Sequence, residues 1–158
     1  MPVWVRTLIF TVLLPGTVAG VVPTWILEGT RGSWGSWRLP PEGWRWLGAA
    51  LGLAGIGLYL WTAGLFTWRG KGTPGPWDPP RKLVTSGPYR LSRNPMYVAV
   101  FCVVQGIAAS AGSWWVAGYG AALLVVWQTF IVLYEEPKLK NLFGEEYAAY
   151  RRSVRRWI

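Results

Sequence analysis

Charged residues are missing from three long stretches of the sequence. Residues 7–27, 46–68 and 94–134 contain no Asp, Glu, Lys or Arg. A helix needs roughly 20 apolar residues to cross a hydrocarbon core ~30 Å thick, so the first two stretches each match one membrane-spanning helix. The third stretch is about twice that length and matches two helices. The pattern therefore predicts an all-α integral membrane protein with four transmembrane helices.

The middle of the third stretch has the composition of a tight turn. Ala111, Gly112 and Ser113 are small residues, and two tryptophans follow them. Small residues allow the chain to reverse sharply, and tryptophan is enriched where helices reach the membrane interface. We therefore expect the last two spans to form a helical hairpin. The four expected spans cover about residues 5–27, 46–68, 95–111 and 114–134.

The first stretch also has some features of a cleaved signal peptide. Arg6 precedes a short apolar run, and small residues occupy positions 18–20. The apolar run continues through Leu27, which a leader cleaved near position 20 does not require. We interpret this stretch as a transmembrane helix, and cleavage is the alternative.

Basic residues are concentrated in two of the segments outside the spans. The 16 Lys and Arg outnumber the 7 Asp and Glu, which gives a formal charge of +9. Most of the basic residues lie in residues 69–93 and after residue 134. Because basic loops stay in the cytoplasm, we expect both of these segments, both termini and any site between them to be cytoplasmic. In a prokaryote the membrane would be the inner one.

Composition narrows the chemistry further. The chain of 158 residues is 52% hydrophobic and has one Cys and no His. So much apolar surface would overfill the core of a small soluble domain. The missing histidine excludes a Ser-His-Asp triad, and the lone Cys102 excludes a thiolate cluster and an intrachain disulfide. We expect a single membrane domain over residues 1–158, with no metal site and no nucleic-acid partner, because the aromatic residues lie mainly in the spans.

The segment between the second and third spans is expected to form a shaped loop. Residues 70–80, GKGTPGPWDPP, contain three Gly and four Pro, which excludes a helix or a central strand. A short extended piece at 83–89 follows and ends in a Gly-Pro turn. Asn94 then has the position of a helix N-cap, with Pro95 in the first turn of the third span. We expect residues 70–94 to wall a binding site.

The fourth span is expected to end at Tyr134-Glu135-Glu136-Pro137. Two carboxylates at the C-terminus of a helix oppose its dipole and repel each other, so they need a compensating partner. Beyond them, apolar residues recur every three or four positions over 137–157, with arginines on other faces. This pattern predicts a cytoplasmic amphipathic helix that lies at the interface, with its apolar side in lipid.

The predicted topology brings these unusual groups to one membrane face. A hairpin that starts and ends in the cytoplasm returns Glu135 and Glu136 to the level of Arg90, Arg93 and Asn94. These carboxylates, guanidinium groups and the amide would then lie together at one end of the bundle, beside the loop at residues 70–80 (the Gly/Pro loop). The structural alternative is a simple interfacial ion pair between Arg93 and either glutamate.

Two motifs in this region resemble the signatures of a family of membrane-integral methyltransferases. GPYRLSRNPMY at 87–97 resembles G-x-Y-R-x-x-R-[H/N]-P-x-Y. The segment 135–158 resembles E-E-x-x-L followed by F-G-x-x-Y-x-x-Y-x-x-x-V-x-R-W. These are signatures of the family that groups isoprenylcysteine carboxyl methyltransferase with the phospholipid N-methyltransferases. The resemblance covers residues 72–158 and is weak in the first two spans.

The resemblance implies an S-adenosylmethionine-dependent methyltransferase. Its acceptor would be a membrane-partitioned small molecule or lipid with a carboxylate or an amine, and membrane lipids would surround it. Glu136, together with Glu135, would hold the α-amino group of the methyl donor, and Arg90 and Arg93 would face a carboxylate or an anionic substrate group. Arg93 and Glu135 are the expected catalytic residues, since Glu135 can take a proton from an amine acceptor. The expected donor pocket comprises Leu83, Val84, Gly87, Pro88, Tyr89, Arg90, Asn94, Pro95, Tyr97 and Glu136.

Asn94 is the main departure from the family pattern. The isoprenylcysteine enzymes typically have histidine there, and an amide cannot gain a proton near neutral pH. The identity of the acceptor therefore stays open, as does the oligomeric state. Two other functions also stay open. One is a nicotinamide-dependent membrane reductase, because sterol-reductase-like proteins have a similar C-terminal layout, and the other is a non-catalytic four-span protein.

Overall fold

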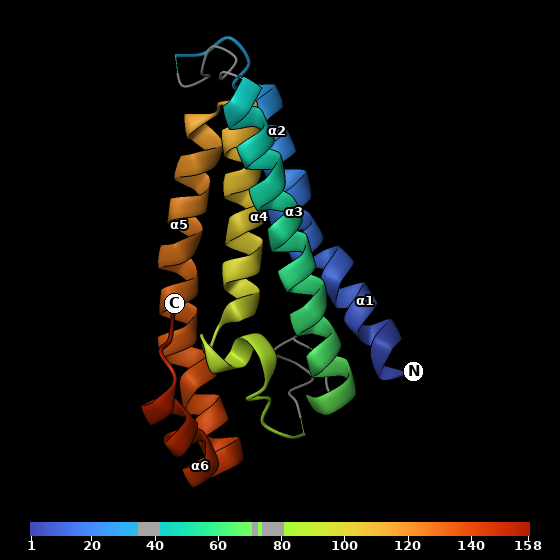
Figure 1. Ribbon diagram of the computed structural model, residues 1–158, viewed down its shortest axis with the longest axis vertical. Coiled ribbons are helices and arrows are strands. Elements are labelled where there is room, and N and C mark those ends of the chain that lie inside the picture. Colours follow the sequence, from blue (N-terminus) through green and yellow to red (C-terminus); the bar gives the residue numbers. More distant parts are fainter. Residues whose placement is uncertain (35–41, 71–72, 74–80) are drawn as a thin grey trace.

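A computed structural model describes residues 1–34, 42–70, 73 and 81–158 of the chain (Figure 1). Among these residues the regular elements are helices and helical turns, with no strand, as the apolar pattern predicts. In chain order they are α1 (Val3–Leu13), the π-helical turn η1 (Thr17–Val21), α2 (Val22–Gly29), α3 (Glu42–Leu65), the π-helical turn η2 (Phe66–Gly70), the 3-10 turn η3 (Gly87–Arg90), α4 (Pro95–Ala111), α5 (Trp114–Phe130), the π-helical turn η4 (Ile131–Glu135) and α6 (Glu136–Ser153).

Three helical runs are long and apolar enough to cross a membrane, judged by length and composition. They are Val3–Gly29, Glu42–Gly70 and the run Trp114–Ser153. The fourth apolar helix, α4, is shorter, with 17 residues. Large apolar side chains such as Leu53 and Leu133 are exposed on these helices, which suits contact with lipid. The helices fall on the charge-free stretches of the sequence, and their composition supports membrane association.

Helices α3 and α4 make the most extensive contact in the described part of the chain. Glycines allow their backbones to touch: a Cβ atom built on Gly106 would lie 2.6 Å from the backbone N of Gly52 and 2.7 Å from the carbonyl O of Gly48. A Cβ atom on Gly55 would lie 2.7 Å from the carbonyl O of Ala99. No side chain larger than hydrogen fits at Gly55 or Gly106, so these glycines allow the two helices to pack closely.

The reversal between α4 and α5 occurs where the small residues predict it. Gly112 has a left-handed conformation with φ of 62°, and its N–H donates to the carbonyl groups of the last turn of α4. Ser113 then caps α5, because its Oγ accepts a hydrogen bond from the N–H of Val116 at 3.3 Å. Figure 1 shows α4 and α5 running side by side from this turn. The predicted hairpin is present.

The expected end of the fourth helix at Pro137 is wrong. The helix continues through η4 into α6, and Pro137 lies in the first turn of α6. A proline ring would clash with the carbonyl four residues earlier in a regular α-helix, and the wider turn of η4 accommodates it. Glu135 and Glu136 therefore lie inside a continuous helical run and not at a helix C-terminus.

The C-terminal segment also differs from the expected interfacial helix. Gly144 has φ of 52°, a conformation that glycine adopts without strain, and it bends α6 into two legs. Tyr147 and Tyr150 of the second leg are buried against Val84 and Tyr89. The apolar side that the sequence assigns to lipid therefore covers the protein's own 83–89 segment. The helix ends at residue 153 and not at 157, and Val154 begins an extended tail.

Candidate functional site

A cavity of about 230 Å³ lies between the helices of the bundle. Helices far apart in the sequence line it: Phe10 comes from α1, Val18 from η1, Val100 from α4 and Trp127 from α5. The rings of Tyr97 and Trp127 lie 5.2 Å apart on its wall, and those of Phe130 and Tyr134 stack at 5.0 Å. The wall is thus mainly apolar and aromatic.

A second cavity of about 50 Å³ adjoins the first. The two have common walls, because four polar or charged residues line both of them: Tyr89, Arg93, Asn94 and Glu135. In the smaller cavity these residues meet Glu136, Tyr147 and Tyr150 of α6. The polar and charged side chains that line the cavities are therefore concentrated where the two cavities meet.

Glu135 is the acidic group that faces both cavities. It is the last residue of η4, directly after the fourth predicted span, and the Tyr97 hydroxyl donates a hydrogen bond to its carboxylate. Burial raises the pKa of Glu135 to about 7, and the charge of Glu136 adds to this rise, while the Tyr97 bond and Lys138 oppose it. A carboxyl group with this pKa can accept a proton near neutral pH.

Glu136, the next residue, is held by two arginines. Its Oε1 accepts from Nη1 of Arg93 at 2.8 Å and from Nε of Arg156 at 2.8 Å, and its Oε2 accepts from Nη2 of Arg156 at 3.2 Å. Burial alone would raise the pKa of Glu136, but the Arg156 hydrogen bonds and the charges of both arginines outweigh this effect and lower it. The ion pair that the sequence offers as an alternative for Arg93 therefore exists, with Glu136 as its partner.

The tail beyond α6 crosses the residues that precede α4. The carbonyl of Arg156 accepts hydrogen bonds from Ser92 Oγ and from Asn94 Nδ2, both at 3.1 Å. The N–H of Arg93 donates to the carbonyl of Arg155 at 2.9 Å. Asn94 does occupy the predicted N-cap position, with Pro95 in the first turn, but its side chain binds the tail and does not cap the helix.

The structure brings together most of the predicted site residues and separates a few. Those that line at least one cavity are Leu83, Val84, Tyr89, Arg93, Asn94, Tyr97, Glu135 and Glu136. Gly87, Pro88 and Pro95 line neither cavity in the described part of the chain, and Pro88 and Pro95 are buried supports. Arg90 is exposed on η3 and lies away from both cavities. Of the Gly/Pro loop, residues 71–72 and 74–80 lie outside the described residues, and Thr73 lines the larger cavity.

Two sets of site residues escaped the sequence analysis. Phe10, Leu14 and Val18 line the larger cavity, and their apolar pattern is the same as that of any lipid-facing helix. Arg156 binds Glu136 although the expected amphipathic helix assigns it to lipid headgroups. The only signal for Arg156 is its place in the R-W pair that ends the second motif.

Most of these site residues lie in a part of the chain that matches a known protein family. A family model described as phospholipid methyltransferase matches residues 44–146, from α3 to the bend in α6. This span includes Arg93, Asn94, Glu135 and Glu136 and ends before Arg156. Comparison with curated proteins and with solved structures gives no match.

Proposed function

The chain belongs to the phospholipid methyltransferase family, and from this premise we propose that it transfers a methyl group from S-adenosylmethionine to the amine of a membrane-partitioned lipid or small molecule. The observation that carries the proposal is the half-buried carboxyl group of Glu135, which lines both cavities. An anionic carboxylate acceptor would meet repulsion from Glu135, whereas a cationic amine would be attracted. The geometry therefore favours the amine among the two acceptor classes that the motifs allow.

The residues at the junction fit the functional groups of this methyl donor. The donor has a carboxylate, an ammonium group, a sulfonium and an aromatic base. Arg93 offers a guanidinium group to the carboxylate. Glu136 has both oxygens bound by arginines but keeps further lone pairs, so together with Glu135 it can accept the ammonium group. Phe66 and Tyr89, with ring centroids 5.6 Å apart, offer an aromatic surface to the base.

The protein's task in this reaction is positioning and proton removal. When bound, the donor supplies an activated methyl group, whose bond to sulfur breaks as the bond to the acceptor nitrogen forms and the sulfur becomes a neutral thioether. An amine is protonated in water at neutral pH and must lose that proton before its lone pair can attack. Glu135 takes the proton, and Tyr97 holds the carboxylate in place. The aromatic walls exclude water from the reacting groups.

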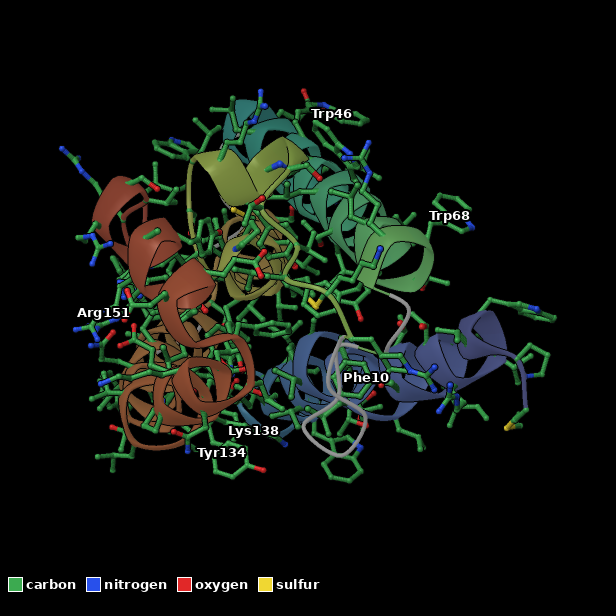
Figure 2. All side chains as sticks on the ribbon, turned by 90° about the horizontal axis from the view of Figure 1, so that it is seen from below. Phe10, Trp46, Trp68, Tyr134, Lys138 and Arg151 are labelled. Atoms are coloured by element: carbon green, nitrogen blue, oxygen red, sulfur yellow. The ribbon has the colours of Figure 1, made fainter. Side chains whose placement is uncertain are left out.

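We also propose how the site sits in the membrane. The four apolar helices cross the bilayer, and the basic segments 69–93 and 136–158 lie on the cytoplasmic side, so the polar donor arrives from the cytoplasm. At ~1.5 Å per residue, the 17 residues of α4 span about 25 Å. This is less than a hydrocarbon core ~30 Å thick, so the turn next to α4 completes the crossing. Figure 2 shows Phe10 on α1 opposite Tyr134 and Lys138, and all three line the larger cavity. A lipophilic acceptor would enter sideways between these elements.

The proposal can be tested with purified protein in lipid nanodiscs. The protein is incubated with methyl-labelled donor and a membrane lipid extract, and the labelled product is isolated. We expect label on an amine that resists mild base, and loss of donor binding in Glu136→Ala. Label that mild base releases as methanol would show a methyl ester and contradict the amine. Binding of a nicotinamide cofactor in place of the donor would support the reductase alternative, and binding of neither would support the non-catalytic one.

A further inference from the structure

Three charged side chains form a cluster beside the smaller cavity, in which Arg93 and Glu136 are buried and Arg156 is partly exposed. Arg93 and Arg156 both bind the carboxylate of Glu136, and the side chains of Arg93 and Glu136 are each only 9% exposed. These three groups carry two positive charges and one negative charge, and the half-buried carboxyl group of Glu135 lies next to them. The positive charge of Arg151 also acts on the Glu136 carboxylate. The buried Arg93 shares the single carboxylate of Glu136 with Arg156, so an anionic ligand group beside Arg93 would be stabilised.

Arg93 also has an unused hydrogen-bond donor. Its Nη1 binds Glu136 and lies 3.5 Å from the Tyr147 hydroxyl, but its Nε is buried and has no hydrogen-bond partner among the described residues. Arg93 lines both cavities. A buried donor without a partner is costly, and an anionic ligand group in the cavity would satisfy it.

Arg156 explains why this donor stays available. Arginine and carboxylate groups pair best through two parallel hydrogen bonds, so Glu136 alone would attract the whole guanidinium group of Arg93. Arg156 already occupies Glu136 through two bonds, and Arg93 reaches it only with Nη1. The tail holds Arg156 there because its carbonyl is bound by Ser92 and Asn94.

We propose that Arg156 is a positioning residue that keeps Arg93 free to bind an anionic oxygen group of the ligand. This inference rests on the proposed function. The oxygen group is the carboxylate of the methyl donor or the phosphate of a lipid acceptor, which a guanidinium group recognises by the same chemistry. Arg156 does not touch the ligand itself and acts through Glu136.

The test measures how well the full chain recognises a carboxylate. Calorimetry in detergent compares the affinity for S-adenosylhomocysteine with that for its decarboxylated analogue. We expect the wild type to prefer the carboxylated ligand by roughly tenfold or more, as for a charge-assisted hydrogen bond. Arg156→Ala should reduce this ratio to near one, and Arg156→Lys should restore part of it. Arg152→Ala removes the same charge from an exposed position of α6 and should leave the ratio unchanged.

A double variant separates positioning from general loss of structure. In Arg156→Ala with Glu136→Gln, Arg93 no longer faces a carboxylate, so the preference for the carboxylated ligand should return although total affinity is lower. A merely structural role would give a further loss of the ratio in the double variant, and that result would overturn the proposal. Melting curves by circular dichroism identify variants that do not fold.

A second measurement, of KM for lipid acceptors, identifies which ligand supplies the anionic group. If the ratio is unchanged in Arg156→Ala but KM rises for phosphate-bearing lipid acceptors and not for phosphate-free amines, the group is the lipid phosphate. If neither quantity changes, the role of Arg156 is refuted while the proposed function stands. If the wild type binds neither donor analogue, the proposed function fails, and this inference fails with it.

Discussion

Two regions of the bundle are packed in opposite ways, one without space between its helices and one around a cavity. In one region α3 and α4 touch backbone to backbone through Gly48, Gly52 and Gly106, and no space remains between them. In the other region α1 diverges from the bundle toward its N-terminal end (Figure 1), and aromatic side chains from α1, α3, α4, α5 and η4 surround a cavity. The comparison teaches that small residues build the scaffold and large aromatic residues build the site. A mutation should therefore affect stability in the first region and activity in the second.

The largest effect on stability is expected at Gly106. Gly106→Leu places atoms where the backbone of α3 lies, so the helix pair must separate, at a cost of about 3 kcal/mol or more. Thermal unfolding in detergent measures this loss. Gly52→Ala is the matched control, since a Cβ atom there meets nothing within 4 Å. Equal melting temperatures for Gly106→Leu and Gly52→Ala would show that the tight contact is not a scaffold.

In the region around the cavity the largest effect is expected at Glu135. Glu135→Gln keeps the shape and the contact with Tyr97 but cannot accept a proton, so kcat should fall roughly 100-fold or more. Donor binding, measured by calorimetry, should fall far less. Glu145→Gln, at an exposed position of α6, should leave kcat unchanged. A normal kcat in Glu135→Gln would remove the proton acceptor from the proposed reaction.

The same residue should make both activity and stability depend on pH. Burial raises the pKa of Glu135 from 4.5 to about 7. Activity should therefore rise with pH through about 7, as the carboxylate form of Glu135 increases. Between pH 4.5 and 7 the folded protein binds a proton that the unfolded chain releases, so this group's contribution to stability falls as the pH rises. Glu135→Gln stays neutral, and its melting temperature relative to the wild type should increase from pH 4.5 to pH 8. A constant difference would contradict the raised pKa.

The smallest effect is expected where the tail meets the bundle. Trp157 donates from Nε1 to Oε1 of Gln128 at 2.9 Å, and Trp157→Phe removes this bond while keeping an aromatic ring. We expect a loss of about 1 kcal/mol in the free energy of unfolding. Trp68→Phe, at an exposed position on η2, is the control and should change stability little. A larger loss at Trp157 would mean that the tail stabilises the scaffold as well as the site.

Sequence patterns predict local features of this molecule well. Charge-free length marks the helices because crossing a bilayer sets a minimum apolar run, and Gly112 marks the reversal because it adopts φ above zero without strain. The motifs also predict that Arg93, Asn94 and Glu135 lie close together, and all three line both cavities. These predictions depend on short stretches of chain, where a residue's own geometry decides.

The features that sequence patterns miss depend on distant contacts. Pro137 does not end the helix, because the π-helical turn before it removes the clash that the local rule assumes. Tyr147 and Tyr150 face the protein and not lipid, because the bend at Gly144 returns them to the 83–89 segment. Arg156 reaches Glu136 only through that bend. No periodicity within a single helix contains this information.

Adjacent residues on an α-helix point about 100° apart, and the wider turn η4, which ends at Glu135, changes this angle locally. The two neighbouring carboxyl groups therefore lie in different surroundings. Glu135 faces the cavities and Tyr97, and Glu136 faces the arginines. Deleting one residue of η4 before Glu135 would rotate everything after it by about that angle, so that Glu136 would take the place of Glu135 and Glu135 would take the place of Tyr134. The helical phase at this turn thus decides which carboxyl group lines both cavities and which pairs with the arginines.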